Sequence, residues 1–313
     1  MLYFFKRFIN TLITIFLVSI ITFFIFNILP GDPAQVILGL DASEEQIIQL
    51  RDTMDLDSPN IVRYINWVEN LIKGDLGISY KYQKPVAPIL FAALKVTLQL
   101  SFLSLILTLI IAIPFGLLLV SKRNKKSYIP LSILSQLGMS IPSFCLGIFL
   151  IAIFTVNLNI LPSIGYVSFS ENPLMNVRSL LLPSLSIAIG ASSIVVRYLN
   201  TSVNQQMKMD YVRTAYSLGL SEKTVLYKQV LRNALIPVIT IIGLIVTDIL
   251  AGSIIVENVF SLPGIGKLIT SSITSRDLPL IQALVLYLSL IVVFVNFIID
   301  ILYKFIDPRI RIK

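Results

Sequence analysis

Few residues in this chain of 313 could carry out chemistry. There is no histidine, which removes the commonest general base and the commonest transition-metal ligand. Hydrolysis by a Ser-His-Asp triad and zinc chemistry on a His-Glu-x-x-His helix are therefore excluded. The single cysteine, Cys145, lies inside an apolar run and is expected to be a small buried hydrophobe. We predict no catalytic residue, no metal ligand and no cofactor-binding residue in this chain.

Two carboxylates stand out because they lie in a long hydrophobic segment. Asp248 falls near the middle of residues 235–256, where a charge costs about 2.5–3.5 kcal/mol on insertion scales. Two hypotheses stay open for Asp248: it lines a translocation pathway that favours cationic cargo or an N-terminal amine, or it is a structural carboxylate at a subunit interface. Glu257, at the end of the same segment, suits a gate of that pathway or an anchor for the following loop, and we favour the anchor.

The hydrophobic segments indicate a polytopic membrane protein. Hydrophobic residues make up 56% of the chain and charged residues 13%, against about 25% charged residues in soluble proteins. A helix needs roughly 20 apolar residues to cross a bilayer. Six windows meet this requirement, at 8–29, 96–120, 128–155, 179–199, 235–256 and 278–303. The first is longer than the apolar region of a signal peptide, so we expect a retained span.

Basic residues cluster at the ends of these spans in a regular way. Most of them fall within 6–7, 122–126, 197–232 and 304–313. By the positive-inside rule, this alternation places both termini in the cytoplasm. It also accounts for the formal charge of +8, so we expect contact with membrane lipid and not with nucleic acid.

The spans divide the chain into four parts. Residues 1–29 form the first span, 30–95 an extracytoplasmic segment, 96–304 a core of five spans, and 305–313 a cytoplasmic tail. The extracytoplasmic segment is too short for a large hydrophobic core, so we expect it to pack as a cap over the external opening of the helix bundle. Within it, Ser43 and Gln46 fit a helix capping box.

A polar loop, residues 200–236, separates the fourth and fifth spans and has the pattern of two amphipathic helices. On a helical wheel, Tyr211, Val212, Ala215 and Leu218 share one face. Within residues 222–235 a second apolar face is formed by Leu226, Tyr227, Val230, Leu231, Ala234 and Leu235, with Lys223 and Val225 off the pattern.

The junction between these two helices carries its own signals. Gly219 suits a helix end because glycine adopts positive φ without a steric clash. Ser221 is a suitable N-cap for the second helix. We predict a rigid elbow made of a helix, a sharp turn and a second helix, with Pro237 where the next span begins. Such an elbow would either dock a cytosolic partner or lie on anionic lipid.

Several short motifs resemble those of one family, in order along nearly the whole chain. They are Leu-Pro-Gly-Asp-Pro-Ala at 29–34, Gly-Asp-Leu-Gly-Ile-Ser at 74–79, Pro-Val at 85–86, Ile-Leu-Pro-Ser-Ile-Gly at 160–165, Leu-Pro-Ser at 182–184, Val-Glu-Asn-Val-Phe-Ser-Leu-Pro-Gly-Ile-Gly at 256–266, Arg-Asp-Leu-Pro at 276–279 and Asp-Pro-Arg at 307–309. Their joint order and spacing, together with the polar loop, resemble the oligopeptide/dipeptide/nickel branch of ABC-importer permeases.

The resemblance implies an all-α membrane protein of the bacterial cytoplasmic membrane, with six transmembrane helices in the type I ABC-importer fold. It implies a transport subunit, not an enzyme, that moves di- or oligopeptides delivered by an extracytoplasmic binding protein. Import of nickel or a metal chelate is the alternative. A homologous second permease and two ABC ATPases would be its partners. The ATPases would use ATP and Mg²⁺, since this chain has no Gly-x-x-x-x-Gly-Lys-Ser/Thr phosphate loop.

The resemblance also places the contact with the ATPases on the polar loop. The residues it implies are Asp210, Tyr211, Arg213, Ala215, Gly219, Leu220, Ser221, Leu226, Arg232, Asn233 and Pro237. One position departs from the broader pattern, because the first residue of Glu-Ala-Ala-x-x-x-Gly is Arg213 here. This puts in doubt any ion-pair role for that position.

Two other classes of function are disfavoured by the same residues. A self-contained secondary transporter would be expected to show an inverted repeat, which the sequence lacks. An intramembrane enzyme would need paired intramembrane aspartates or a serine with a base, and neither pattern is present.

Overall fold

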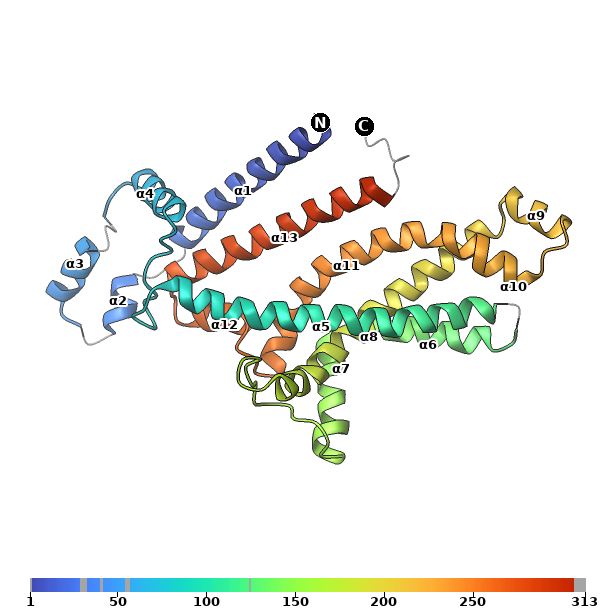
Figure 1. The fold of residues 1–313 in the computed structure, drawn as a ribbon. Coiled ribbons are helices and arrows are strands. Elements are labelled where there is room, and N and C mark those ends of the chain that lie inside the picture. The colour runs from blue at the N-terminus through green and yellow to red at the C-terminus, as the bar shows by residue number, and fades with distance from the viewer. Residues whose placement is uncertain (1, 29–32, 40–41, 54–56, 124, 307–313) are drawn as a thin grey trace. The chain divides into compact units, whose positions relative to one another are not determined.

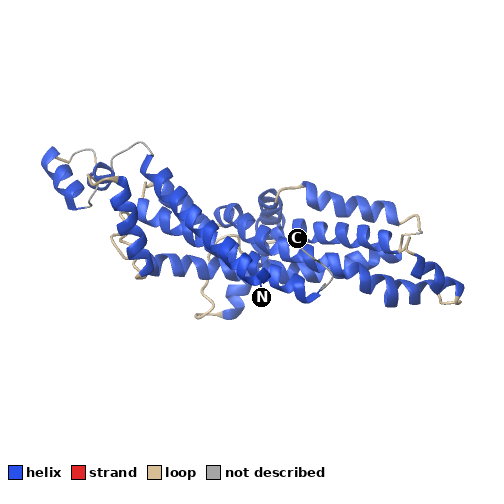
Figure 2. Cartoon of the chain, turned by 90° about the horizontal axis from the view of Figure 1, so that it is seen from above, coloured by secondary structure: helices blue, strands red, loops and turns tan. Residues whose placement is uncertain are grey.

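A computed structural model describes residues 2–28, 33–39, 42–53, 57–123 and 125–306. Across this described part the regular elements are all helices, apart from an isolated antiparallel bridge between Ile78 and Pro85 (Figure 2). The expected motifs at 29–32 and 307–309, and most of the predicted tail 305–313, lie outside the described residues.

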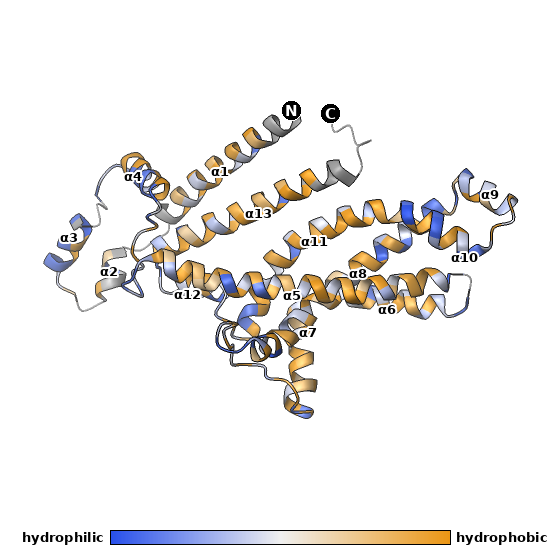
Figure 3. Ribbon diagram, viewed as in Figure 1, coloured by the Kyte–Doolittle hydropathy of each residue, from blue (hydrophilic) through white to orange (hydrophobic). Residues whose placement is uncertain are grey.

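Among the described residues, five helices are long and apolar enough to cross a membrane. They are α1 (Leu2–Ile28), α5 (Val86–Ser121), α8 (Pro173–Gln206), α11 (Leu231–Val259) and α13 (Leu278–Ile306). Figure 3 shows apolar residues along their lengths, whereas hydrophilic residues concentrate on α3 (Glu44–Thr53) and around α9 (Asp210–Ser217) and α10 (Glu222–Thr224).

The third predicted span is a broken helix. It consists of α6 (Tyr128–Ser140), α7 (Ser143–Leu150) and the π-helical segment η1 (Ile151–Asn157), with a bend of 101° between α6 and α7. Ile141 is extended, with φ −96° and ψ 123°, because a residue before proline avoids the helical conformation and Pro142 follows. The described part of the chain thus holds six candidate spans when this pair counts as one, which agrees with the predicted six. Pro114 and Pro183, in contrast, lie inside continuous helices.

The chain forms two compact units. Unit 1 comprises Met1–Val96 and Pro263–Phe297, and unit 2 comprises Thr97–Leu262 and Ile298–Lys313. Unit 1 thus joins the N-terminal part of the chain to Pro263–Phe297, a segment that lies far from it in the sequence.

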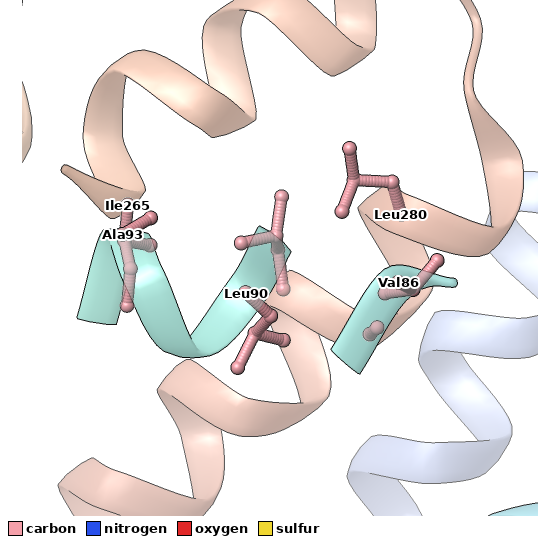
Figure 4. Close-up of a cluster of buried hydrophobic side chains, with 7 residues drawn as sticks. Val86, Leu90, Ala93, Ile265 and Leu280 are labelled. Carbon is pink, nitrogen blue, oxygen red and sulfur yellow. The ribbon is translucent and has the colours of Figure 1, made fainter. Parts of the chain in front are cut away.

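The core of unit 1 explains why these two segments pack together. Val86, Leu90 and Ala93 on the first turns of α5 pack against residues that follow more than 170 positions later in the chain. Ile265, at the start of α12 (Ile265–Thr274), and Leu280, at the start of α13, complete the buried cluster shown in Figure 4. Hydrophobic burial therefore joins segments that the linear order of spans keeps apart.

The described residues of the predicted extracytoplasmic segment, 30–95, form the helices α2 (Pro33–Leu38), α3 and α4 (Asn60–Ile72) and the first turns of α5. The capping box at the start of α3 is confirmed. The Gln46 backbone N–H donates to Ser43 Oγ at 3.4 Å, and the Ser43 N–H donates to Gln46 Oε1 at 3.1 Å.

In unit 2, α8 is the central helix and packs against α6, α7 and α11. Small residues permit close contacts between these helices. At Gly147 on α7, for example, an added Cβ would lie 2.9 Å from a ring carbon of Phe260. A larger side chain there would separate the two segments, since protein interiors are close-packed.

Two polar loops lie at the same end of unit 2. Gly116 of α5 approaches Leu199 of α8, and the Asn200 side-chain amide donates to the Tyr128 hydroxyl at 2.8 Å. These contacts bring the basic loop 122–126 and the polar loop 207–221 to one end, which agrees with the expectation that both face the same side of the membrane. At the opposite end, the Tyr166 hydroxyl donates to Gln99 Oε1 at 3.0 Å.

Candidate functional site

The predicted elbow is present at the end of unit 2. Helix α9 and helix α10 extend beyond the ends of α8 and α11 and are joined by residues 218–221 (Figure 1). Helix α10 continues without a break through the π-helical segment η2 (Val225–Val230) into α11. The second arm of the elbow is thus the start of the fifth span, and Pro237 lies inside α11 and does not mark a separate beginning.

The turn at Gly219 is a Schellman motif. Gly219 has a φ of +79°, and its N–H donates to the carbonyl of Tyr216 at 2.9 Å. The N–H of Leu220 donates to the carbonyl of Ala215 at 3.3 Å. A glycine is favoured at position 219 because any residue with a Cβ is strained in the left-handed conformation.

Ser221 then starts the second arm, as predicted. Its Oγ accepts a hydrogen bond from the Thr224 N–H at 3.4 Å and caps the helix. Two adjacent local signals therefore fix the angle of the elbow within four residues.

The base of the elbow is buried within unit 2. Val212 and Ala215 of α9 and Leu226 of η2 are buried, and α9 packs directly on η2. Ser202 on α8 donates its hydroxyl to the carbonyl of Ala234 at 3.0 Å. A force applied to α9 would thus reach both α8 and α11 through packed side chains and a buried hydrogen bond.

The tip of the elbow, defined as Tyr216, Leu218, Leu220 and Tyr227, exposes large apolar side chains. Leu218 is 75% exposed, and the other three are exposed as well. On the helical wheel Leu218 falls on one face with Val212 and Ala215, but it does not share their burial. Leu218 is the C-cap of α9, with ψ 7°. The helical wheel assumed that the helix continues through residue 218, whereas α9 ends at Ser217.

Charged groups surround this tip. Arg213 and Asp210 are exposed, with Arg213 Nη1 3.6 Å from Asp210 Oδ1. Arg232 and Asn233 are exposed on the second arm. Tyr211 is partly buried, and its hydroxyl donates to Gln206 Oε1 at 2.9 Å. An apolar centre inside a charged rim is the usual composition of a protein–protein interface.

The π-helical segment changes which residues face the core. Val225, off the predicted pattern, is fully buried, whereas Tyr227 and Leu235 of the predicted apolar face are exposed. The i→i+5 turn of a π-helix is wider than that of an α-helix, so the face shifts after residue 224. The wheel at 100° per residue could not anticipate this shift.

The two membrane carboxylates lie in different environments. Asp248 is exposed on the surface of α11. Glu257 is fully buried, and Thr97 on α5 donates its hydroxyl to Glu257 Oε1 at 2.7 Å. The Glu257 carbonyl also accepts from the N–H of Leu262 at 2.9 Å. The structure therefore favours the anchor hypothesis for Glu257, whereas Asp248 is free to face a partner or a pathway.

Sequence reasoning missed a buried carboxylate in unit 1, Asp277. Its side chain is fully buried and accepts a hydrogen bond from the Ser79 hydroxyl. It also accepts from the backbone N–H groups of Tyr80 at 3.1 Å, Lys81 at 3.2 Å and Leu280 at 3.4 Å. Burial, opposed by the charge of Arg63, raises the pKa of the Tyr80 hydroxyl to about 12. The sequence signal for this contact was the pair of motifs at 74–79 and 276–279, because the hydrogen bonds of Asp277 bring these two motifs together.

Comparison with protein families agrees with this architecture. Residues 112–312 match the family described as "Binding-protein-dependent transport system inner membrane component". Residues 1–101 match the corresponding N-terminal family.

Two curated relatives align with the whole chain. A putative peptide transport system permease protein of Brucella abortus (strain 2308) is 37% identical over 306 residues, covering 98% of both chains. The glutathione transport system permease protein GsiC of Shigella flexneri serotype 5b is 36% identical over 311 residues, covering 99% of both.

Solved structures share the fold. An inward-facing structure of the MetNI methionine ABC transporter aligns with 70% of this chain and 96% of its own, at a TM-score of 0.57 and 16% identity. An amino acid ABC transporter aligns with 70% of this chain at a TM-score of 0.52 and 15% identity. The fold is therefore that of an ABC-importer permease.

Proposed function

Because the chain belongs to the family of binding-protein-dependent transport system inner membrane components, we propose that it is the permease subunit of an ATP-driven importer of short peptides. Members of this family are transport subunits and not enzymes. The chain is a multi-pass membrane protein, and we place it in a bacterial cytoplasmic membrane.

The elbow is the observation that carries the proposal. It has an exposed apolar tip, a charged rim and a base packed on two spans. This arrangement suits docking to a cytosolic ATPase better than contact with lipid. The hydrogen bond from Ser202 holds the base of the elbow, and the Schellman turn at Gly219 fixes the angle between its two arms. The elbow can therefore pass a displacement to the spans instead of bending. Leu220 belongs to the apolar centre of the docking surface, and Asp210 and Arg213 belong to its charged rim.

Peptide cargo is supported by the names of the relatives, a putative peptide permease and a glutathione permease. These relatives do not favour the alternative cargo of nickel or a metal chelate. Asp248 adds a feature of this chain itself, because an exposed carboxylate on a membrane span is expected to meet a polar pathway or a partner. We assign it to the pathway, where it would attract the amino terminus of a peptide.

The proposal requires other chains. Two ATPases would dock on two elbows, one on this chain and one on a homologous second permease, and would hold ATP and Mg²⁺. An extracytoplasmic binding protein would deliver the cargo. These partners follow from the type of machine to which the family belongs.

The test is substrate-stimulated ATP hydrolysis by the reconstituted complex. This chain is combined in proteoliposomes with the permease, ATPases and binding protein encoded beside it. The panel contains di- to pentapeptides, glutathione, and Ni²⁺ with and without small chelators. Stimulation by peptides or glutathione is expected. Stimulation by Ni²⁺ or its chelates alone would overturn the cargo, and uptake by this chain without ATPases would overturn the whole proposal.

A further inference from the structure

Helix α4, in the segment between the first two spans, has a wider apolar side than its neighbour covers. At 100° per residue, Ile61, Ile65, Val68 and Ile72 form one stripe along the helix. A second set, Tyr64, Trp67 and Leu71, lies directly beside this stripe. The polar residues Arg63, Asn66 and Asn70 occupy the opposite side.

The aromatic set attaches α4 to α1. The rings of Tyr64 and Trp67 lie 5.4 Å and 5.6 Å from the ring of Phe23. The Tyr64 hydroxyl lies 2.8 Å from Ser19 Oγ in a hydrogen bond. Figure 1 shows α4 beside the C-terminal end of α1. The orientation of α4 about its own axis is therefore fixed by named contacts.

The isoleucine stripe, in contrast, is uncovered in this chain. Ile61 is 66% exposed, Ile65 58% and Ile72 82%. These side chains lie next to the face that contacts α1 and away from the polar side of α4. On α1, Phe16 and Leu12 lie on the same face as Ser19 and Phe23, one and two turns further from α4, and they are 58% and 50% exposed.

The position of α4 along α1 sets its depth. The apolar window of α1 is Phe8–Ile25, and the contacts of Tyr64 and Trp67 fall on Ser19 and Phe23, near its end. Six residues of helix between Ser19 and Ile25 span roughly 9 Å. Interfacial helices insert their apolar faces to about 5–10 Å at the boundary of headgroups and acyl chains.

We propose that α4 is an interfacial helix whose isoleucine stripe inserts into the lipid around α1. Tyr64 and Trp67 then lie at the level where aromatic belts of membrane proteins are found. The exposed pair of Lys73 and Glu69, at 2.6 Å, remains on the aqueous side. The helix anchors the extracytoplasmic segment to the membrane surface.

Lipid fits this stripe better than a protein partner does. A binding protein that docks and leaves meets a surface about as polar as the rest of the protein, and α4 offers such a surface only on its Arg63 side. The stripe is purely aliphatic and lies at the level of the apolar window of α1, where the surroundings of a membrane helix are apolar.

The experiment compares two positions on α4 in the assembled transporter. Cys145, the only cysteine of the chain, is first replaced by alanine. Ile65→Cys places an environment-sensitive NBD fluorophore on the stripe. Asn70→Cys, about 140° away around the helix, is the matched control. Quenching is measured in phosphatidylcholine nanodiscs by lipids with doxyl groups on the acyl chains and, separately, by iodide in water.

We expect lipid quenching at Ile65→Cys to exceed that at Asn70→Cys at least threefold, with the opposite order for iodide and a blue-shifted emission at Ile65→Cys. Equal lipid quenching at both positions, or strong iodide quenching at Ile65→Cys, would overturn the proposal. Protection of Ile65→Cys from both quenchers would also overturn it and would indicate a protein partner on the stripe. Peptide-stimulated ATP hydrolysis by each labelled variant verifies that the complex is assembled.

Discussion

Ser79 donates its hydroxyl to the buried carboxylate of Asp277, across 198 positions of sequence. The same carboxylate caps α13 through the N–H of Leu280 and receives two N–H groups from the turn that leads into α5. One side chain thus fixes the entry of two spans. Gly77 helps to form this turn, because its φ of +81° is one that glycine adopts readily. A Cβ added at Gly77 would lie 3.6 Å from the Cβ of Pro279.

Replacing Asp277 by alanine should destabilise unit 1 strongly. It leaves buried donors without an acceptor, and each costs about 1–3 kcal/mol. We expect a fall of several degrees in the Tm of the purified complex, with a smaller fall for Ser79→Ala. Lys81→Ala is the control, since it removes an exposed hydrogen bond to Ser271 and the contact of its ammonium with the Tyr82 ring but keeps the backbone N–H that Asp277 accepts. An Asp277→Ala protein as stable as Lys81→Ala would show that the network is not structural.

This network also marks the limit of sequence reasoning in this chain. The spans could be predicted, because crossing a bilayer imposes a length and an apolar composition that any window reveals. The hydrogen bond between Ser79 and Asp277 could not be predicted, since the motifs at 74–79 and 276–279 each have the local pattern of an ordinary loop. For the same reason, the packing of Pro263–Phe297 with the N-terminal part was not anticipated.

The elbow shows the same contrast on a smaller scale. Gly219 and Ser221 could be predicted because a positive φ and an N-cap are local requirements of the backbone. The burial of Val225 and the exposure of Leu218 could not, because they depend on a π-helical turn and on where α9 ends.

Gly219→Val should uncouple ATP hydrolysis from uptake while leaving insertion intact. A β-branched residue at φ +79° costs about 1–2 kcal/mol, so the turn and the angle between α9 and α10 should change. Gly74→Val is the matched control, because Gly74 has a φ of +83° and open space around it, as Gly219 does, but lies in unit 1. We expect uptake per ATP to fall only in Gly219→Val. Normal coupling in that variant would contradict the rigid elbow.

Leu218→Asp should weaken binding of the ATPase without unfolding the permease. The side chain is largely exposed, and a charge at the centre of an apolar interface typically costs affinity tenfold or more. The ATPase retained on the immobilised permease is measured after washing. Leu174→Asp is the control, because Leu174 is 76% exposed at the start of α8, the end of that helix away from the elbow. Equal retention in the two variants would place the docking surface elsewhere.

Asp248→Asn should change which cargo is carried, and not whether ATP is hydrolysed. If the carboxylate attracts the amino terminus of a peptide, the variant loses uptake of free peptides while N-acetylated peptides are affected little. We expect the ratio of the two uptake rates to fall about tenfold, the effect of 1.4 kcal/mol. Glu257→Gln serves as the comparison: its carboxylate is buried against Thr97, so it should lower stability and leave this ratio unchanged. An unchanged ratio in Asp248→Asn, with lower stability instead, would assign Asp248 to a subunit interface.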